Sequence, residues 1–200
     1  AHEQHAGHAA DGYARASGKT GVCIATSGPG ATNLVTPIAT AYMDSTPIVF
    51  ITGNVPQSLM GTDSFQEADI SGMTTPVTKH NYLVTRVDKL ADIVREAFYI
   101  ASSGRPGPVL VDIPKDVTAA LAEYEPAPAA PARPAEPPKE ERLTMTKERL
   151  ASCRQPLIYF GGGVISSGAE AELLALAESQ DIPVCASMMG LGGFPARHRL

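Results

Sequence analysis

The chain has 200 residues, enough for one domain and part of another, and its hydrophobic fraction of 44% suits a packed globular core. Its formal net charge of −5 comes without a basic stripe, which argues against nucleic acid or an anionic membrane as partner. No apolar run approaches the ~20 residues that a membrane helix needs.

In the first part of the chain, segments with helical spacing alternate with short apolar runs. Gly18 closes the first helical pattern, as is typical of a helix C-terminus, and the residues from Asn54 to about Lys79 show little periodicity. The expected helices cover residues 4–17, 31–43 and 90–102, and the expected strands cover 22–26, 47–53 and 108–114.

Strands without polar alternation, separated by helices, predict a parallel sheet that is covered on both faces. The first part of the chain is therefore expected to be a doubly wound α/β domain. In such a domain, ligands collect at the carboxyl ends of the strands.

A change of composition marks a second region. Residues 123–141 are rich in Pro, Ala and Glu, which predicts an extended linker between a domain at 1–122 and the beginning of a second α/β domain at 142–200. In this second region we expect helices at 142–152 and 169–179, strands at 156–160 and 182–186, and a tight turn at 161–163.

The three cysteines show no metal-ligand or redox spacing. Cys23 and Cys185 lie in apolar runs, and all three cysteines are expected to be buried thiols that behave as small hydrophobes in a reducing compartment. No metal site is predicted, because no set of ligands with suitable spacing occurs.

Two segments near the N-terminus carry candidate chemistry. Glu3 opens the first helix, where a carboxylate complements the helix dipole, and small residues follow it on one face, so that a flat ring or another helix could come close. In a dry site this carboxyl would be shifted toward its neutral form. Gly28 and Gly30, in the turn that leads to Asn33, would let the backbone approach a ligand at a helix start.

Two other segments are less specific. The loop 61–67 places Phe65 beside Gln66, which suits contact with a polar substrate, although a plain surface loop explains it as well. The run Gly161-Gly162-Gly163 follows a strand but lacks dinucleotide-binding spacing, which favours a tight turn over a nucleotide site.

Several blocks in order resemble one family. The segment from HEQHAGHAADGYARASG to TPIVFITG resembles the pyrimidine-binding domain of thiamine-diphosphate enzymes. GTDSFQEADI, TKHNYLV and SGRPGPVLVDIPKDV resemble the acetolactate synthase large subunit, and PLIYFGGGV and IPVCASMMGLGGFP resemble the start of that family's central domain. His5 and Ser64 depart mildly from the family pattern.

This resemblance implies decarboxylation of pyruvate on thiamine diphosphate and transfer of the two-carbon unit to pyruvate or 2-oxobutyrate, the first common step of branched-chain amino-acid biosynthesis. Glu3 would be the catalytic carboxylate that contacts the pyrimidine ring. The remaining matches are Gly28, Gly30 and Asn33 on the cofactor side, Arg105 toward FAD, and Pro56, Phe65, Gln66 and Lys115 along the substrate channel.

The resemblance also implies Mg²⁺ held outside this chain, a homodimer or larger assembly with the active site between subunits, a regulatory small subunit in some members, and a bacterial cytoplasm or a plastid. Pyruvate oxidase, sulfoacetaldehyde acetyltransferase, a catabolic acetolactate synthase and a non-catalytic binding module remain alternatives. The start at Ala1 and the end at Leu200 suggest truncation at both ends, so we expect the fragment alone to be inactive.

Overall fold

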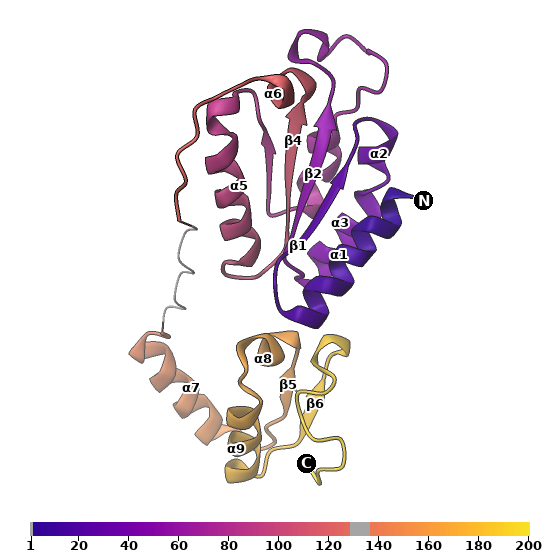
Figure 1. Cartoon of the computed structure of the whole chain (residues 1–200). Helices are drawn as coiled ribbons and strands as arrows, with labels where there is room; N and C mark the ends of the chain where they lie inside the picture. The colour runs from indigo at the N-terminus through magenta and orange to yellow at the C-terminus, as the bar shows by residue number, and fades with distance from the viewer. Residues whose placement is uncertain (1, 129–136) are drawn as a thin grey trace. The chain divides into compact units, whose positions relative to one another are not determined.

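The computed structural model describes residues 2–128 and 137–200, which fall into two compact units (Figure 1). The first unit is Ala1–Ala135 and the second is Glu136–Leu200. Residues 129–136 of the predicted linker lie outside the described residues, and helix α7 begins at Glu140, inside the range predicted as linker.

The first unit is built on a four-stranded sheet in the order β1-β2-β4-β3, and every neighbouring pair is parallel. This architecture confirms the predicted α/β fold. The strand that was not predicted is β3, whose four residues begin with His80 and Asn81 and lack an apolar run. The strands are β1 (Gly21–Ala25), β2 (Ile48–Asn54), β3 (His80–Leu83) and β4 (Pro108–Pro114).

Helices cover both faces of this sheet, with α1 and α3 on one side and α5 on the other (Figure 1). Gly18 ends α1 in the left-handed conformation, with φ 68°, as predicted. The helices are α1 (Glu3–Ser17), α2 (Pro29–Thr32), α3 (Val35–Asp44), α4 (Ile70–Thr74), α5 (Val87–Ser102) and α6 (Lys115–Ala119), with 3-10 turns η1 (Gln57–Leu59) and η2 (Thr75–Val77).

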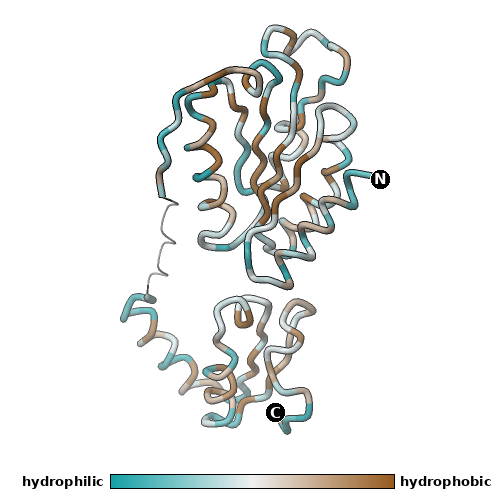
Figure 2. Tube along the Cα trace, in the orientation of Figure 1, coloured by the Kyte–Doolittle hydropathy of each residue, from teal (hydrophilic) through white to brown (hydrophobic). Residues whose placement is uncertain are grey.

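The core of the first unit consists of two layers, one on each face of the sheet. Phe50 and Leu110 point to the layer under α1 and α3, whereas Val49, Val109 and Val111 point to the layer under α5. Figure 2 shows the strands as the hydrophobic centre of the unit. Alternate residues of β2 and β4 thus serve opposite faces, which is why their sequences are apolar throughout.

The single helix predicted for residues 31–43 is wrong, because the chain forms two helices, α2 and α3, separated at Asn33 and Leu34. Pro37 gives the reason. A proline inside a continuous helix removes a hydrogen bond and its ring clashes with the carbonyl four residues earlier, which here belongs to Asn33. The interruption leaves Asn33 at the end of α2.

The second unit contains a pair of parallel strands, β5 (Ile158–Phe160) and β6 (Val184–Ala186). The predicted tight turn at 161–163 is wrong, because Gly162 and Gly163 begin a helix. A side chain at Gly162 would lie 3.0 Å from the Met189 carbonyl oxygen, so its absence allows close packing. The other elements are α7 (Glu140–Ser152), α8 (Gly162–Ser167), α9 (Glu170–Gln180) and η3 (Met188–Gly190).

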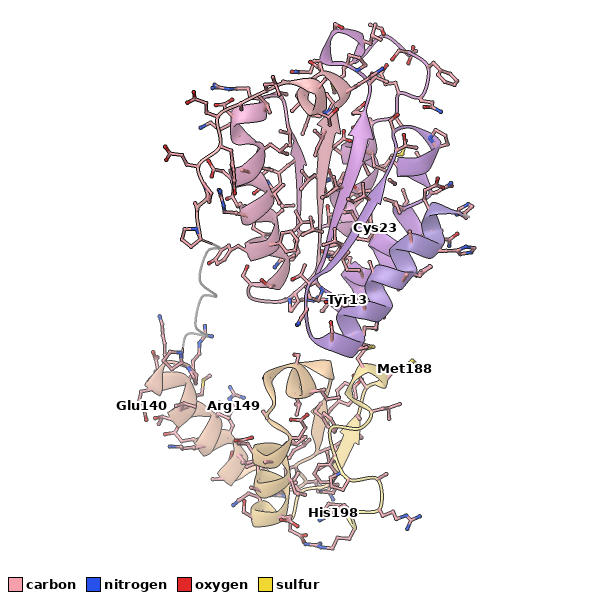
Figure 3. All side chains as sticks on the ribbon, viewed as in Figure 1. Tyr13, Cys23, Glu140, Arg149, Met188 and His198 are labelled. Carbon is pink, nitrogen blue, oxygen red and sulfur yellow. The ribbon has the colours of Figure 1, made fainter. Side chains whose placement is uncertain are left out.

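The expectation of buried thiols holds for Cys23, on β1 (Figure 3), and is wrong for the other two cysteines. Burial raises the pKa of the Cys23 thiol, which makes it unreactive. Cys153 is exposed after the end of α7, and Cys185 lies on an exposed side of a two-stranded sheet. Within the described ranges, no helix is both long and apolar enough to cross a bilayer.

Candidate functional site

Glu3 and Asn33 meet at the carboxyl end of β1. Glu3 lies in the first turn of α1, and Asn33 follows α2 after the turn that leaves β1. The Asn33 Nδ2 donates a hydrogen bond of 2.9 Å to Glu3 Oε2. Because α1 runs antiparallel to β1, the start of this helix returns to the edge of the sheet where the turn begins (Figure 1).

The turn between β1 and α2 packs tightly around its glycines. Gly28 has φ 57° and ψ −120°, a backbone conformation that is unfavourable for any residue with a Cβ. Gly30 is buried, and a Cβ there would lie 2.6 Å from Thr26 Cγ2 and 3.7 Å from Glu3 Oε1. The carboxylate of Glu3 therefore faces bare backbone on this side.

A second close contact sets the spacing between Glu3 and Asn33. Gly7 lies one turn after Glu3 on α1, and a Cβ there would be 2.5 Å from Pro37 Cγ on α3. Pro37 in turn lies four residues after Asn33. The face of α1 that carries small residues thus lets α3 pack closely against it, which is one of the two roles expected for these residues. This close packing brings the side chains of Glu3 and Asn33 together.

The expected shift of Glu3 toward its neutral form is wrong for this chain. The hydrogen bond from Asn33 lowers the pKa of Glu3, with further lowering from backbone hydrogen bonding within the first turn of α1, and these effects outweigh burial, which raises it. Glu3 is partly exposed here, and its amide partner stabilises the ionised form. The site therefore presents a carboxylate, which is a hydrogen-bond acceptor.

The loop after β2 reaches this turn through Gln66. Its backbone occupies the space beside Gly28, where a Cβ would lie 2.8 Å from both Gln66 Cα and Gln66 O. Gln66 itself has φ 63°, an unusual conformation for a residue with a side chain. Phe65, next to it, is 89% exposed. The structure thus brings Gln66, together with the turn glycines, to the edge where Glu3 lies.

Pro56 and Lys115 lie in segments that follow β2 and β4 and are tied together by their neighbours. Asp116 Oδ1 accepts a hydrogen bond of 3.0 Å from the Gln57 backbone N–H, and Asp116 Oδ2 accepts one of 2.8 Å from Gln57 Nε2. These contacts lower the pKa of Asp116. Both segments belong to the same carboxyl edge of the sheet.

Arg105 stands apart from the other predicted residues, because it precedes β4 and so lies at the amino end of the sheet. Its Nε donates to Ser45 Oγ at 2.7 Å, and its Nη2 donates to the Met43 carbonyl at 3.2 Å. The exposed guanidinium thus caps the C-terminus of α3. The structure does not bring Arg105 near Glu3.

Two acidic residues of this edge were not singled out from the sequence. Asp112 on β4 is buried and accepts hydrogen bonds from Thr52 Oγ1 at 2.7 Å and Asn54 Nδ2 at 2.5 Å, while burial raises its pKa. An aspartate within an apolar strand was the available signal. Glu67 accepts hydrogen bonds from its own loop, a contact that no sequence pattern indicates.

Comparison with known families gives two matches. Residues 1–73 match the description "Thiamine pyrophosphate enzyme, N-terminal TPP binding domain", and residues 143–200 match "Thiamine pyrophosphate enzyme, central domain". The first match contains Glu3, the turn glycines, Asn33 and the loop with Gln66. The two matches lie in the first and second units respectively.

Curated relatives cover the whole chain. The acetolactate synthase of Arthrospira platensis is 52% identical over 100% of this chain and 35% of its own length. The acetolactate synthase of Mycobacterium leprae is 54% identical over 98% of this chain and 32% of its own length. The acetolactate synthase large subunit of Corynebacterium glutamicum is 52% identical over 100% of this chain and 32% of its own length. The chain spans about a third of the length of these relatives.

The matches fall on two domains of one family in their proper order, and together they cover more than half of the chain. The relatives are identical at about half of the positions along its full length. The chain therefore belongs to the thiamine pyrophosphate enzyme family, as a homologue of the acetolactate synthase large subunit.

Proposed function

We propose that the full-length protein carrying this chain is an acetolactate synthase that decarboxylates pyruvate and transfers the two-carbon unit to pyruvate or 2-oxobutyrate. The names of its relatives support this reaction over pyruvate oxidase, sulfoacetaldehyde acetyltransferase or a binding module. The chain covers about a third of those relatives, so the proposal concerns the whole protein rather than this segment.

The pair formed by Glu3 and Asn33 carries the proposal. A heterocycle that exchanges a ring proton needs a fixed acceptor, and the Asn33 amide holds the Glu3 carboxylate at 2.9 Å. Gly28 and Gly30 leave bare backbone beside it, which suits a flat ring that must approach closely. These residues fit thiamine diphosphate, with Glu3, Gly28, Gly30 and Asn33 as its holders on this side.

The chemistry divides between cofactor and protein. Thiamine diphosphate supplies the electron sink for decarboxylation when it is bound. Glu3 would accept a hydrogen bond from the pyrimidine ring and hold the shared proton at its carboxylate. Asn33 orients this carboxylate through Nδ2 and lowers its pKa, so it is ionised and able to accept at neutral pH.

Substrate recognition is proposed to use the loops at the same edge. Pro56, Phe65, Gln66 and Lys115 would line the channel, with the Lys115 ammonium and the Gln66 amide suited to the carboxylate and carbonyl of a 2-oxo acid. The backbone contact between Gln66 and Gly28 supports this assignment, because it joins the proposed substrate loop to the proposed cofactor turn.

Further cofactors and partners are also proposals. The family resemblance implies Mg²⁺, which we assign to a part of the full-length protein outside this chain. FAD would contact Arg105, whose exposed guanidinium suits a phosphate. A homodimer or larger assembly, a regulatory small subunit and a cytoplasmic location follow from the family resemblance. The 200-residue chain alone is expected to be inactive.

Replacing Glu3 with Gln in the full-length enzyme tests the proposal. The amide keeps the shape of the side chain but cannot hold the proton, so acetolactate formation from pyruvate should fall by about 10² or more. Product is measured by NMR, with exposed Glu123→Gln as the matched control. Near-native turnover by the Glu3→Gln variant would refute the assignment, and acetate or acetyl phosphate as product would favour a related enzyme.

A further inference from the structure

The loop that follows β2 holds an unusual backbone conformation at an exposed surface. Three residues of this loop have positive φ angles: Gly61 at 79°, Asp63 at 56° and Gln66 at 63°. Side chains disfavour the left-handed region, so a loop with two such residues needs fixed contacts to keep this shape. Phe65, at 89% exposure, contributes little packing.

The carboxylate of Glu67 supplies those contacts. Glu67 Oε1 accepts from the backbone N–H of Gly61, and Glu67 Oε2 accepts from the Ser64 backbone N–H at 3.0 Å and from Ser64 Oγ at 3.2 Å. The Glu67 N–H in turn donates to the Ser64 carbonyl at 3.0 Å. One side chain thus closes the loop on both sides of Asp63.

In this closed conformation, Gln66 of the loop packs against the proposed cofactor-binding turn at Gly28. Gln66 directly precedes Glu67, and the Gln66 backbone fills the space beside Gly28 that a Cβ would otherwise take. The hydrogen bonds from Gly61 and Ser64 also lower the pKa of Glu67, so the group remains an ionised acceptor at neutral pH. Loss of these contacts would release Gln66 from the turn and, with it, the neighbouring Phe65 from its place in the loop.

We infer that Glu67 is a positioning residue for substrate, which acts by fixing Phe65 and Gln66 beside the Gly28 turn rather than by touching the reacting atoms. This inference rests on the proposed function. It predicts a separation of effects, because Glu67 holds the substrate loop while Glu3 and Asn33 hold the proton site. Substrate affinity should depend on Glu67, and activation of the cofactor should not.

The test compares Glu67→Gln, Glu67→Asp, Ser64→Ala and the control Glu123→Gln in the full-length enzyme with its cofactors. Glu67→Gln places an amide donor against the N–H groups of the loop, so the KM for pyruvate should rise about tenfold or more. Proton exchange at C2 of bound thiamine diphosphate should stay within about twofold of wild type. Glu67→Asp should recover part of the KM, and Ser64→Ala, which removes one contact, should have a smaller effect than Glu67→Gln.

Each contrary outcome overturns the inference. An unchanged KM in Glu67→Gln would show that the loop does not depend on Glu67, and a parallel loss of C2 exchange would assign the residue to the cofactor site instead. Amide hydrogen exchange separates this from a failure of the proposed function. Even if the wild type forms no acetolactate, the amides of Gly61 and Ser64 should exchange faster in Glu67→Gln, and equal rates would overturn the positioning role.

Discussion

The two ends of the first sheet use charge in opposite ways. At the carboxyl end, Glu3, Glu67 and Asp116 all accept hydrogen bonds from amides, and these bonds lower the pKa of each carboxyl. At the amino end, Lys79 and Arg105 donate to carbonyl oxygens near the ends of α5 and α3. These three carboxylates thus accept hydrogen bonds from amides at one edge, whereas these two cations donate to helix-terminal carbonyls at the other.

This difference follows from the topology. Helices that return along parallel strands place their N-termini at the carboxyl edge and their C-termini at the amino edge, so the helix dipoles favour anions at the first and cations at the second. The carboxyl edge also carries the backbone conformations that only glycine adopts readily, as at Gly28. At the carboxyl end, the Gln66 backbone packs closely against Gly28, whereas at the amino end Lys79 and Arg105 cap the C-termini of α5 and α3.

The largest effect is expected from Gly28→Ala, which disrupts the packing of the carboxyl edge. A Cβ there would lie 2.8 Å from the Gln66 backbone, and φ 57° with ψ −120° suits only glycine, so the turn and the loop must separate. A displacement of this kind should lower kcat/KM for pyruvate in the full-length enzyme by about 10².

Gly12→Ala is the matched control for this substitution. Gly12 lies within α1, where a Cβ meets nothing within 4 Å, so alanine should leave kcat/KM unchanged and stabilise the helix by up to about 1 kcal/mol. Equal activity of the two variants would mean that the contact between Gly28 and Gln66 has no functional role.

A smaller effect is expected from Lys79→Met, which tests the amino edge. Lys79 Nζ donates to the carbonyls of Ile100 and Ser103, and the variant leaves both without this donor. The free energy of unfolding should fall by about 1–2 kcal/mol while the KM for pyruvate stays unchanged. Exposed Lys89→Met, on α5, should cost less than about 0.5 kcal/mol. A raised KM for Lys79→Met would erase the distinction between the two edges.

The smallest effect concerns Asp112, inside the sheet near its carboxyl end. Burial raises the pKa of Asp112 in the folded state, so its contribution to stability is present at low pH and is lost as pH rises through that folded pKa. Urea midpoints of wild type and Asp112→Asn, measured from about pH 4 to about pH 7, should therefore diverge, with the variant gaining relative stability as pH rises. Parallel curves would show that the raised pKa has no energetic consequence.

The sequence was most informative where one residue or a short run decides the structure. The apolar residues of β2 and β4 predicted a parallel sheet, and Gly18 marked the end of α1. The helix break before Pro37 was missed by the single helix predicted for residues 31–43, although that proline was a local signal for it.

Contacts between distant segments could not be predicted in this way. The backbone of Gln66 meets Gly28 only because both loops leave neighbouring parallel strands at the same edge. The lowered pKa of Glu3 likewise depends on Asn33, whose side chain reaches the carboxylate because α2 ends there. Residue type was enough to indicate Glu3 as a candidate site residue, whereas its protonation state could be inferred only from the folded structure.

The contact between Gly7 and Pro37 has a consequence for how such a site can evolve. The spacing between α1 and α3 is set at Gly7, one turn away from the carboxyl group of Glu3, so this spacing can change without a change at Glu3. A lineage that acquired a larger residue at position 7 would widen that gap and weaken the amide partner of the carboxylate, and so change its acidity. The carboxyl-bearing residue itself would remain unchanged.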